Sequence, residues 1–174
     1  MKPIGDYEGI LSSRTLEQFL AYHPPGVLLQ DTAKGSFQAL DGKPGETLFR
    51  FYDLDSPSPS EDSIPKAVRY MVLLLRSARD HAATRLLVGC SEACDVEIRD
   101  KSVSREHAWI ECREDAYYIR DSESTIGTRV NSKRLQIGEE RKLNNSDRVT
   151  IGTVDTTFFD PVGFYLFAKE FLGV

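Results

Sequence analysis

Cysteine is scarce and long hydrophobic runs are missing from this 174-residue chain. Three cysteines, an odd number, are too few to build a disulfide scaffold. The longest apolar run is residues 70–75, whereas a membrane-spanning helix needs about 20 apolar residues. No hydrophobic stretch follows Met1 that would serve as a signal peptide. We therefore expect a cytoplasmic protein that has no transmembrane segment.

An excess of basic residues is also missing. The chain has 22 Lys and Arg against 27 Asp and Glu, a net charge of −5, which argues against a nucleic-acid partner. Two short stretches are nevertheless basic and free of acids, residues 101–105 and 124–134. They suit a small anionic ligand better than a polyanion, although exposed turns often carry Lys and Arg without binding anything.

Motifs of catalysis and of cofactor binding are absent as well. The sequence has no Gly-x-Ser-x-Gly elbow, no Walker loop and no Gly-x-Gly-x-x-Gly turn. It also has no paired-carboxylate constellation. We therefore expect a protein that is not an enzyme and that needs no cofactor.

A segment rich in Ser, Pro and acidic residues, 55–63, divides the chain and reads as an exposed loop. Residues 1–65, which include this segment, are predicted to be a small α+β extension. Leu16, Phe19, Leu20 and His23 have helical spacing, with Ser13 or Thr15 as a cap, and short strands are expected at 27–29 and 48–51.

Residues 66–160 have the pattern of an all-β sandwich, with many short strands and polar turns between them. An acidic turn at 113–115 between two strand-like segments predicts a hairpin. The last predicted unit, 161–174, is a helix with Asp160 as its N-cap, Pro161 at its first position and Gly173 at its end. Because this helix is so apolar, we expect it to dock on the rest of the chain.

Cys90, Cys94, His107 and Cys112 are spaced superficially like zinc ligands. If residues 107–112 form one strand, His107 and Cys112 face opposite sides of the sheet and do not reach one ion without a bulge. We predict no metal site, and keep a metal- or thiol-dependent protein using Cys90, Cys94 and His107 as an alternative.

The most informative stretch is residues 88–131. It contains Ser104-Arg105-Glu106-His107 and then Ser124-Thr125-Ile126-Gly127-Thr128-Arg129-Val130-Asn131. In order, spacing and flanking strands this resembles the forkhead-associated (FHA) domain, over about residues 68–160.

The resemblance implies an eleven-stranded β-sandwich, a non-catalytic module whose loops at one end bind a phosphothreonine peptide. A phosphate with about −1.5 to −2 charges suits loops rich in hydroxyls, amides and cations. The candidate residues of the binding loops are Cys90, Ser91, Lys101, Ser104, Arg105, Thr125, Ile126, Gly127, Lys133 and Arg134. Gly89, His107 and Asn131 are expected to have structural roles, His107 by bracing a loop.

Two positions depart from the family pattern. Cys90 follows Gly89 where the family has an arginine at the phosphate, and Ile126 precedes Gly127 where it has an asparagine that binds the peptide backbone. Losing a guanidinium removes a bond of about 1.5–3 kcal/mol. We therefore predict a degenerate FHA interaction module in cytoplasmic signalling that binds an unphosphorylated or atypical protein partner. A conventional phosphothreonine-binding domain using Ser104, Arg105 and Thr125 is the alternative, and the oligomeric state stays open.

Overall fold

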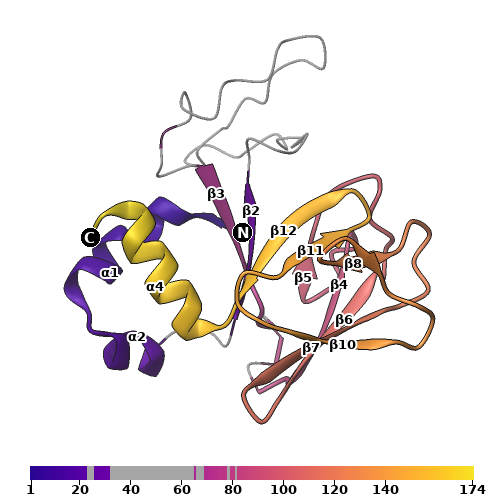
Figure 1. Ribbon diagram of the computed structural model, residues 1–174, viewed down its shortest axis with the longest axis horizontal. Helices are drawn as coiled ribbons and strands as arrows, with labels where there is room; N and C mark the ends of the chain where they lie inside the picture. The colour runs from indigo at the N-terminus through magenta and orange to yellow at the C-terminus, as the bar shows by residue number, and fades with distance from the viewer. Residues whose placement is uncertain (23–25, 32–64, 66–68, 78, 81) are drawn as a thin grey trace.

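The structure, a computed structural model, describes residues 1–22, 26–31, 65, 69–77, 79–80 and 82–174. In this part of the chain twelve strands form two sheets, and helices from both termini pack together beside the sandwich (Figure 1). The predicted all-β sandwich is confirmed, with twelve described strands where the family resemblance implied eleven.

The larger sheet has seven strands, and each is antiparallel to its neighbours. In spatial order they are β1 (Lys2–Pro3), β3 (Tyr70–Leu74), β2 (Val27–Asp31), β12 (Val154–Phe159), β11 (Arg148–Ile151), β8 (Thr128–Val130) and β9 (Lys133–Arg134). Strand β2 lies between β3 and β12, so the N-terminal residues share one sheet with the rest of the sandwich. The predicted division of the chain at residue 65 remains an interpretation of the sequence, because residues 32–64, with the expected strand at 48–51 and the Ser/Pro segment, lie outside the described residues.

The smaller sheet has five strands and contains the predicted hairpin. Its order is β10 (Glu140–Leu143), β7 (Ala116–Asp121), β6 (Ala108–Arg113), β4 (Arg85–Gly89) and β5 (Val96–Glu97). Strands β6 and β7 are joined by a two-residue turn in which Glu114 and Asp115 have φ of 50° and 61°. Positive φ at both positions gives the turn the twist that a tight hairpin needs.

The core between the sheets follows from alternation along the strands. In β4, Leu86 and Val88 are buried, and in β6 Ala108 and Ile110 are buried, while the residues between them face outward. Side chains of a strand point to opposite faces in turn, so each strand contributes one apolar row to the interior. The outward row of the five-stranded sheet includes Trp109.

Four helical segments surround a second apolar cluster: η1 (Ile4–Tyr7), α1 (Glu8–Ser13), α2 (Leu16–Tyr22) and α4 (Pro161–Leu172). The ends of α4 confirm the prediction, because Asp160 accepts a hydrogen bond of 2.7 Å from the Gly163 amide and Gly173 has φ of 78°. Thr15 is the predicted cap of α2 and accepts a bond from the Gln18 amide.

Helix α4 packs against α1, α2 and β12, and its aromatic side chains meet those of the N-terminal helices. The rings of Tyr7 and Phe164 have centroids 5.2 Å apart, and those of Phe19 and Tyr165 are equally close. The predicted apolar face of α2 is buried at Phe19 but exposed at Leu20 (40%), and His23 lies outside the described residues. None of the described helices has the length and apolarity to cross a membrane.

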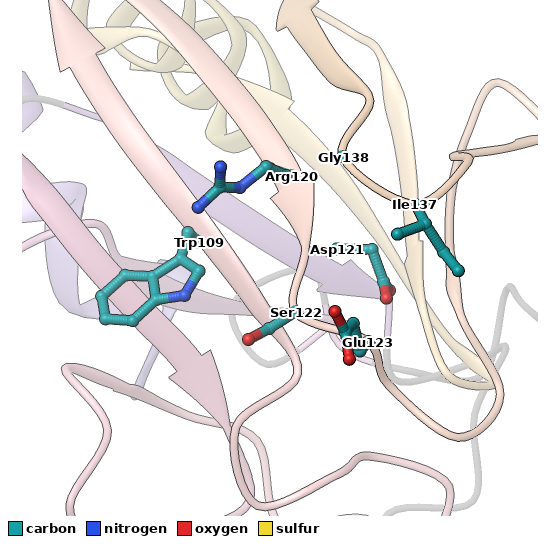
Figure 2. A pocket seen from close by; sticks show the side chains of 7 residues that line it. All are labelled: Trp109, Arg120, Asp121, Ser122, Glu123, Ile137 and Gly138. Carbon is teal, nitrogen blue, oxygen red and sulfur yellow. The ribbon is translucent and has the colours of Figure 1, made fainter.

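An open hollow of about 420 Å³ lies on the outer face of the five-stranded sheet (Figure 2). Trp109 from β6, Arg120 from β7 and Ile137 from the loop between β9 and β10 line it. This hollow is not among the features that the sequence predicted.

Candidate binding loops

The loop after β4 and the loop between β5 and β6 are joined through their backbones. The Cys90 amide donates to the Ser104 carbonyl at 3.0 Å, and the Ser91 amide donates to the Arg105 carbonyl at 3.4 Å. Gly89 makes this approach possible, because a Cβ at this position would lie 2.2 Å from the Arg105 carbonyl oxygen. A side chain there would force the two loops apart.

His107 connects these loops to two others from the interior. Its Nδ1 accepts from the Ser104 amide at 2.9 Å, and its Nε2 lies 3.3 Å from the Gly127 carbonyl oxygen. The Gly152 amide nitrogen lies 3.2 Å from Nε2 and also 3.2 Å from the Gly127 carbonyl oxygen. Because the Ser104 amide donates to Nδ1, the proton of a neutral ring belongs on Nε2 and is donated to Gly127, and the Gly152 amide then donates to the same carbonyl. Burial lowers the pKa of His107, although the Gly127 carbonyl and Asp121 act in the opposite direction. The ring is fully buried and neutral, with both nitrogens engaged.

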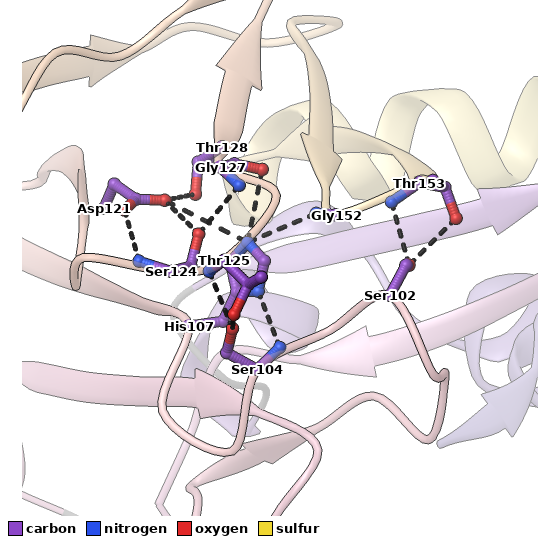
Figure 3. A network of polar contacts seen from close by, with 10 residues as sticks. All are labelled: Ser102, Ser104, His107, Asp121, Ser124, Thr125, Gly127, Thr128, Gly152 and Thr153. Atoms are coloured by element: carbon purple, nitrogen blue, oxygen red, sulfur yellow. Dashed lines mark hydrogen bonds and ion pairs between the residues drawn. The ribbon is translucent and has the colours of Figure 1, made fainter.

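Ser104 and Thr125, from loops 21 residues apart, are brought side by side (Figure 3). The Thr125 amide donates to the Ser104 Oγ at 3.1 Å, and the two hydroxyl oxygens are 3.4 Å apart. The structure therefore places the two predicted hydroxyl residues together at the exposed end of the loops.

Asp121 organises the loop that carries Thr125, and the sequence prediction missed it. Its carboxylate accepts from the Ser124 amide at 2.8 Å, the Ser124 hydroxyl at 2.8 Å and the Thr128 hydroxyl at 2.6 Å. Burial raises the pKa of Asp121, but the hydrogen bonds from Thr128 and Ser124 outweigh it and the pKa lies below its usual value. The Ser124 hydroxyl also accepts from the Gly127 amide at 2.9 Å. The signal was the spacing of Asp121, Ser124 and Gly127, since short polar side chains at i+3 often close turns.

The turn between β11 and β12 is a further part of the loop end that the sequence did not indicate. The Ser102 hydroxyl accepts from the Thr153 amide at 2.9 Å and pairs with the Thr153 hydroxyl at 2.8 Å (Figure 3). Gly152 has φ of 64°, and a Cβ there would lie 2.4 Å from the Ser102 carbonyl oxygen. These contacts join residues 51 positions apart, which explains why no local pattern revealed them.

The predicted cations lie on the loop between β5 and β6 and on β9, and all are exposed. Arg134, on β9, extends its guanidinium over Gly127, where a Cβ would lie 2.7 Å from its Nε. Arg105 and Lys101 are on the loop between β5 and β6, and Lys133 is beside Arg134. Among the described residues, no carboxylate lies within 4.0 Å of these four side chains.

The two departures from the family pattern have different surroundings. Cys90 is half-buried and packs against the core, whereas Ile126 is 36% exposed. Asn131 has φ of 50° in the turn after β8; its Nδ2 donates to Asp147 at 2.7 Å and its Oδ1 accepts from the Arg148 amide at 2.9 Å. Asn131 thus holds the turn that leads to Lys133 and Arg134.

The alternative of a metal site formed by Cys90, Cys94 and His107 requires that these side chains be free to coordinate one ion. The Cys94 thiol donates to the Arg105 carbonyl at 3.0 Å, and burial raises the pKa of this thiol. His107 is engaged at both nitrogens. Within the described ranges, no three side chains of His, Cys, Asp or Glu come together in a way that would hold a metal ion.

A model of the FHA domain family matches residues 86–152. The protein FraH of Nostoc sp. is 40% identical over 57 residues, which cover 33% of this chain and 20% of FraH. The match therefore spans about a fifth of that relative's length.

Solved structures that are similar to this chain include EmbR of Mycobacterium tuberculosis in complex with a low-affinity phosphopeptide. It is 20% identical, with a TM-score of 0.46, and the match covers 77% of this chain and 24% of EmbR. The N-terminal FHA domain of Rad53p from S. cerevisiae, in complex with a phosphothreonine peptide, is 19% identical with a TM-score of 0.44. The match covers 60% of this chain and 90% of the Rad53p domain. Full-length yeast Pml1p is 15% identical with a TM-score of 0.47, and the match covers 92% of this chain and 94% of Pml1p.

Proposed function

We propose that this chain, an FHA domain protein with the family match at residues 86–152, is a recognition module of cytoplasmic signalling. It binds a segment of a partner protein, and this segment needs no phosphothreonine. FHA domains are phosphopeptide-binding modules and not enzymes. The observation that carries the proposal is the pair Cys90 and Ile126, at the positions where the family has arginine and asparagine. Without the guanidinium a phosphate loses a bond of about 1.5–3 kcal/mol, or roughly ten- to a hundredfold in affinity.

The chemistry of the loop end supports an uncharged ligand. The Ser104 Oγ already accepts from the Thr125 amide, and the two hydroxyls lie within 3.4 Å of each other. Ile126 adds an exposed apolar side chain beside them. A partner segment with small polar and apolar side chains fits this combination, because the hydroxyls supply hydrogen bonds and Ile126 supplies apolar contact.

Gly89, His107 and Asn131 are scaffold residues in this proposal, since each holds a loop or turn in place and His107 has no exposed atom. The division into an extension at 1–65, a sandwich at 66–160 and a terminal helix at 161–174 is part of this proposal. Among the described residues, β1 and β2 are strands of the larger sheet.

A conventional phosphothreonine site is the second candidate, and the positions of the cations favour it. Ser104 and Thr125 are adjacent, Arg105 follows Ser104, and the guanidinium of Arg134 lies over Gly127. Arg105 and Arg134 have no carboxylate partner within 4.0 Å among the described residues. A phosphate placed between them would gain charge-assisted hydrogen bonds without the arginine that Cys90 replaces.

Fluorescence anisotropy with a degenerate peptide library, in matched phosphothreonine and unphosphorylated forms, tests the proposal. We expect the wild-type protein to bind members of the unphosphorylated set at least as tightly as their phosphorylated counterparts. The double substitution Cys90→Arg with Ile126→Asn is expected to gain a preference for phosphothreonine of about tenfold or more.

Two arginine variants separate the candidates. If the wild type prefers phosphothreonine and Arg105→Ala abolishes that preference, the second candidate holds and the first is wrong. Arg76→Ala, which removes an exposed arginine next to Tyr7 in the helical cluster, is the matched control and is expected to change neither set. Absence of binding to both peptide sets would overturn both candidates.

A further inference from the structure

Trp109, the single tryptophan of the chain, lies on the outer face of the five-stranded sheet. The hollow beside it borders the start of the loop that carries Thr125. It alternates along β6 with Ala108 and Ile110, which are buried in the core, so its own side chain faces outward. Across the sheet its neighbours are Leu87 on β4 and Arg120 on β7. Arg85 stacks on the indole, with its guanidinium carbon 4.2 Å from the ring centroid.

The arginines of this face fall into two kinds. Arg113 is neutralised, because it pairs with Glu140, lies 3.9 Å from Glu111 and stacks on Tyr118. Arg85 and Arg120 are exposed and have no carboxylate within 4.0 Å among the described residues. Glu111 and Glu140 are the cross-strand neighbours of Arg85 and Arg120, but both are near Arg113. The two guanidiniums that flank Trp109 can therefore pair with an external anion.

The open hollow of about 420 Å³ lies next to this pair (Figure 2). Trp109 and Arg120 stand on one side of it, and Ile137 stands across from them. Ile137 is 87% exposed, so most of its apolar side chain is accessible to a ligand. Asp121 and Glu123 also line it, so the hollow is a mixed apolar and charged site and not a uniformly basic patch.

We propose that this surface, formed by Arg85, Trp109, Arg120 and Ile137, is a second protein-binding surface that takes an acidic segment of a partner with a large apolar side chain. The carboxylates of the segment pair with Arg85 and Arg120, and its apolar side chain enters the hollow between Trp109 and Ile137. Tryptophan and arginine are the residue types that contribute most to binding at interface centres. Asp121 and Glu123 in the lining and the acidic protein as a whole oppose a nucleic acid, whose charge would extend beyond the two arginines.

Because Trp109 is the only tryptophan, its emission reports directly on the proposed surface. The full chain is titrated with short unphosphorylated peptides that contain glutamates around a leucine or phenylalanine and no tryptophan. The same peptides with lysine in place of glutamate are the charge control. We expect a saturable change in emission with the glutamate peptides, weakened by added salt, and none with the lysine peptides.

Charge reversal identifies the residues. Arg85→Glu with Arg120→Glu is expected to weaken the affinity for the glutamate peptides by about tenfold or more. The double variant Lys2→Glu with Arg76→Glu is the control, because it makes the same change of net charge at exposed positions outside this sheet. Apart from the effect of the changed net charge, it is expected to bind the glutamate peptides within about twofold of the wild-type affinity. If circular dichroism shows that the charge-reversal variant no longer unfolds cooperatively on heating, the double variant Arg85→Gln with Arg120→Gln is used in its place.

The proposal is overturned if the glutamate peptides give no saturable change in emission, if the lysine peptides bind equally well, or if the two double variants lose affinity to the same extent. None of these results depends on phosphate, Cys90 or Ile126, so they do not bear on the function proposed for the loops.

Discussion

The loop end and the helical cluster of this protein are held together by different interactions. Around His107 the contacts are directional hydrogen bonds between loops that lie 20 to 51 residues apart in sequence. Around Phe164 they are ring contacts, such as those with Tyr7 and Phe19 at centroid distances of 5.2 and 6.3 Å. Directional bonds place side chains precisely where a ligand arrives, whereas apolar burial supplies most of the folding free energy. The comparison predicts that substitutions in the helical cluster lower stability most, while substitutions in the loop end act on position and on pH dependence.

The largest effect is expected for Phe164→Ala. The ring is 2% exposed, and its loss leaves a cavity between α4 and the N-terminal helices, which lowers the free energy of unfolding by about 3–5 kcal/mol. Urea unfolding at pH 7 measures it. Leu166→Ala on the same helix is the control, because Leu166 is 58% exposed and its removal should change stability by about 0.5 kcal/mol or less. Similar losses for the two variants would show that the cluster does not stabilise the fold.

A smaller effect is expected for Gly89→Ala at the loop end. The added Cβ meets the Arg105 carbonyl oxygen at 2.2 Å, and overpacking of this kind costs about 1–3 kcal/mol. Peptide binding at the loops should decrease as well, because the Cys90–Ser104 backbone bond is displaced. Gly9→Ala in α1 is the matched control: its Cβ meets nothing within 4 Å, and the change should stabilise the helix by about 0.5–1 kcal/mol. An unchanged urea midpoint for Gly89→Ala would contradict the close approach of the two loops.

The smallest effect is a pH dependence that originates in His107. Since its folded pKa is lowered below the ordinary 6.5, the unfolded chain binds the proton more readily. Stability is therefore complete above pH 6.5 and decreases as the pH falls from there toward the folded pKa, with a slope of up to about 1.4 kcal/mol per pH unit.

Comparing the wild type with His107→Gln isolates this contribution, because glutamine keeps an acceptor and a donor but does not titrate. Urea unfolding from about pH 8 to about pH 5 covers the window, and stays above the range in which Asp121 begins to be protonated. The difference in stability between the two proteins should shrink as the pH falls. A constant difference would show that His107 is not the titrating group.

Local features of the fold were predictable from the sequence. The hairpin between β6 and β7 follows from its acidic turn, and α4 from its cap at Asp160 and its end at Gly173. Each depends on residues a few positions apart, so a linear pattern contains the whole signal. The short strands β8, β9 and β10 were not individually predicted, since two to four residues carry too little periodicity.

The contacts at the loop end were only partly predictable from the sequence. Ser104 and Thr125 were named from the family resemblance, and they do lie together. Asp121 and the Ser102–Thr153 pair were missed, because their roles depend on loops brought together by the two sheets. The spacing of Asp121, Ser124 and Gly127 indicates a polar turn, but many turns share it, and the burial that surrounds Asp121 depends on the packing of the two sheets.

The sequence by itself determined several of the longer strands, where the terminal helix begins and ends, and which residue types stand at the loop positions, with Cys90 and Ile126 among them. These properties follow from periodicity and turn chemistry, which act over a few residues. Only the tertiary structure decided that Arg134 lies over Gly127, and that Arg85 and Arg120 flank Trp109 on the outer face of a sheet. The physical reason is that strand pairing and sheet packing join residues far apart in the chain, and the environment they create sets the burial, the charge pairing and the pKa of each side chain.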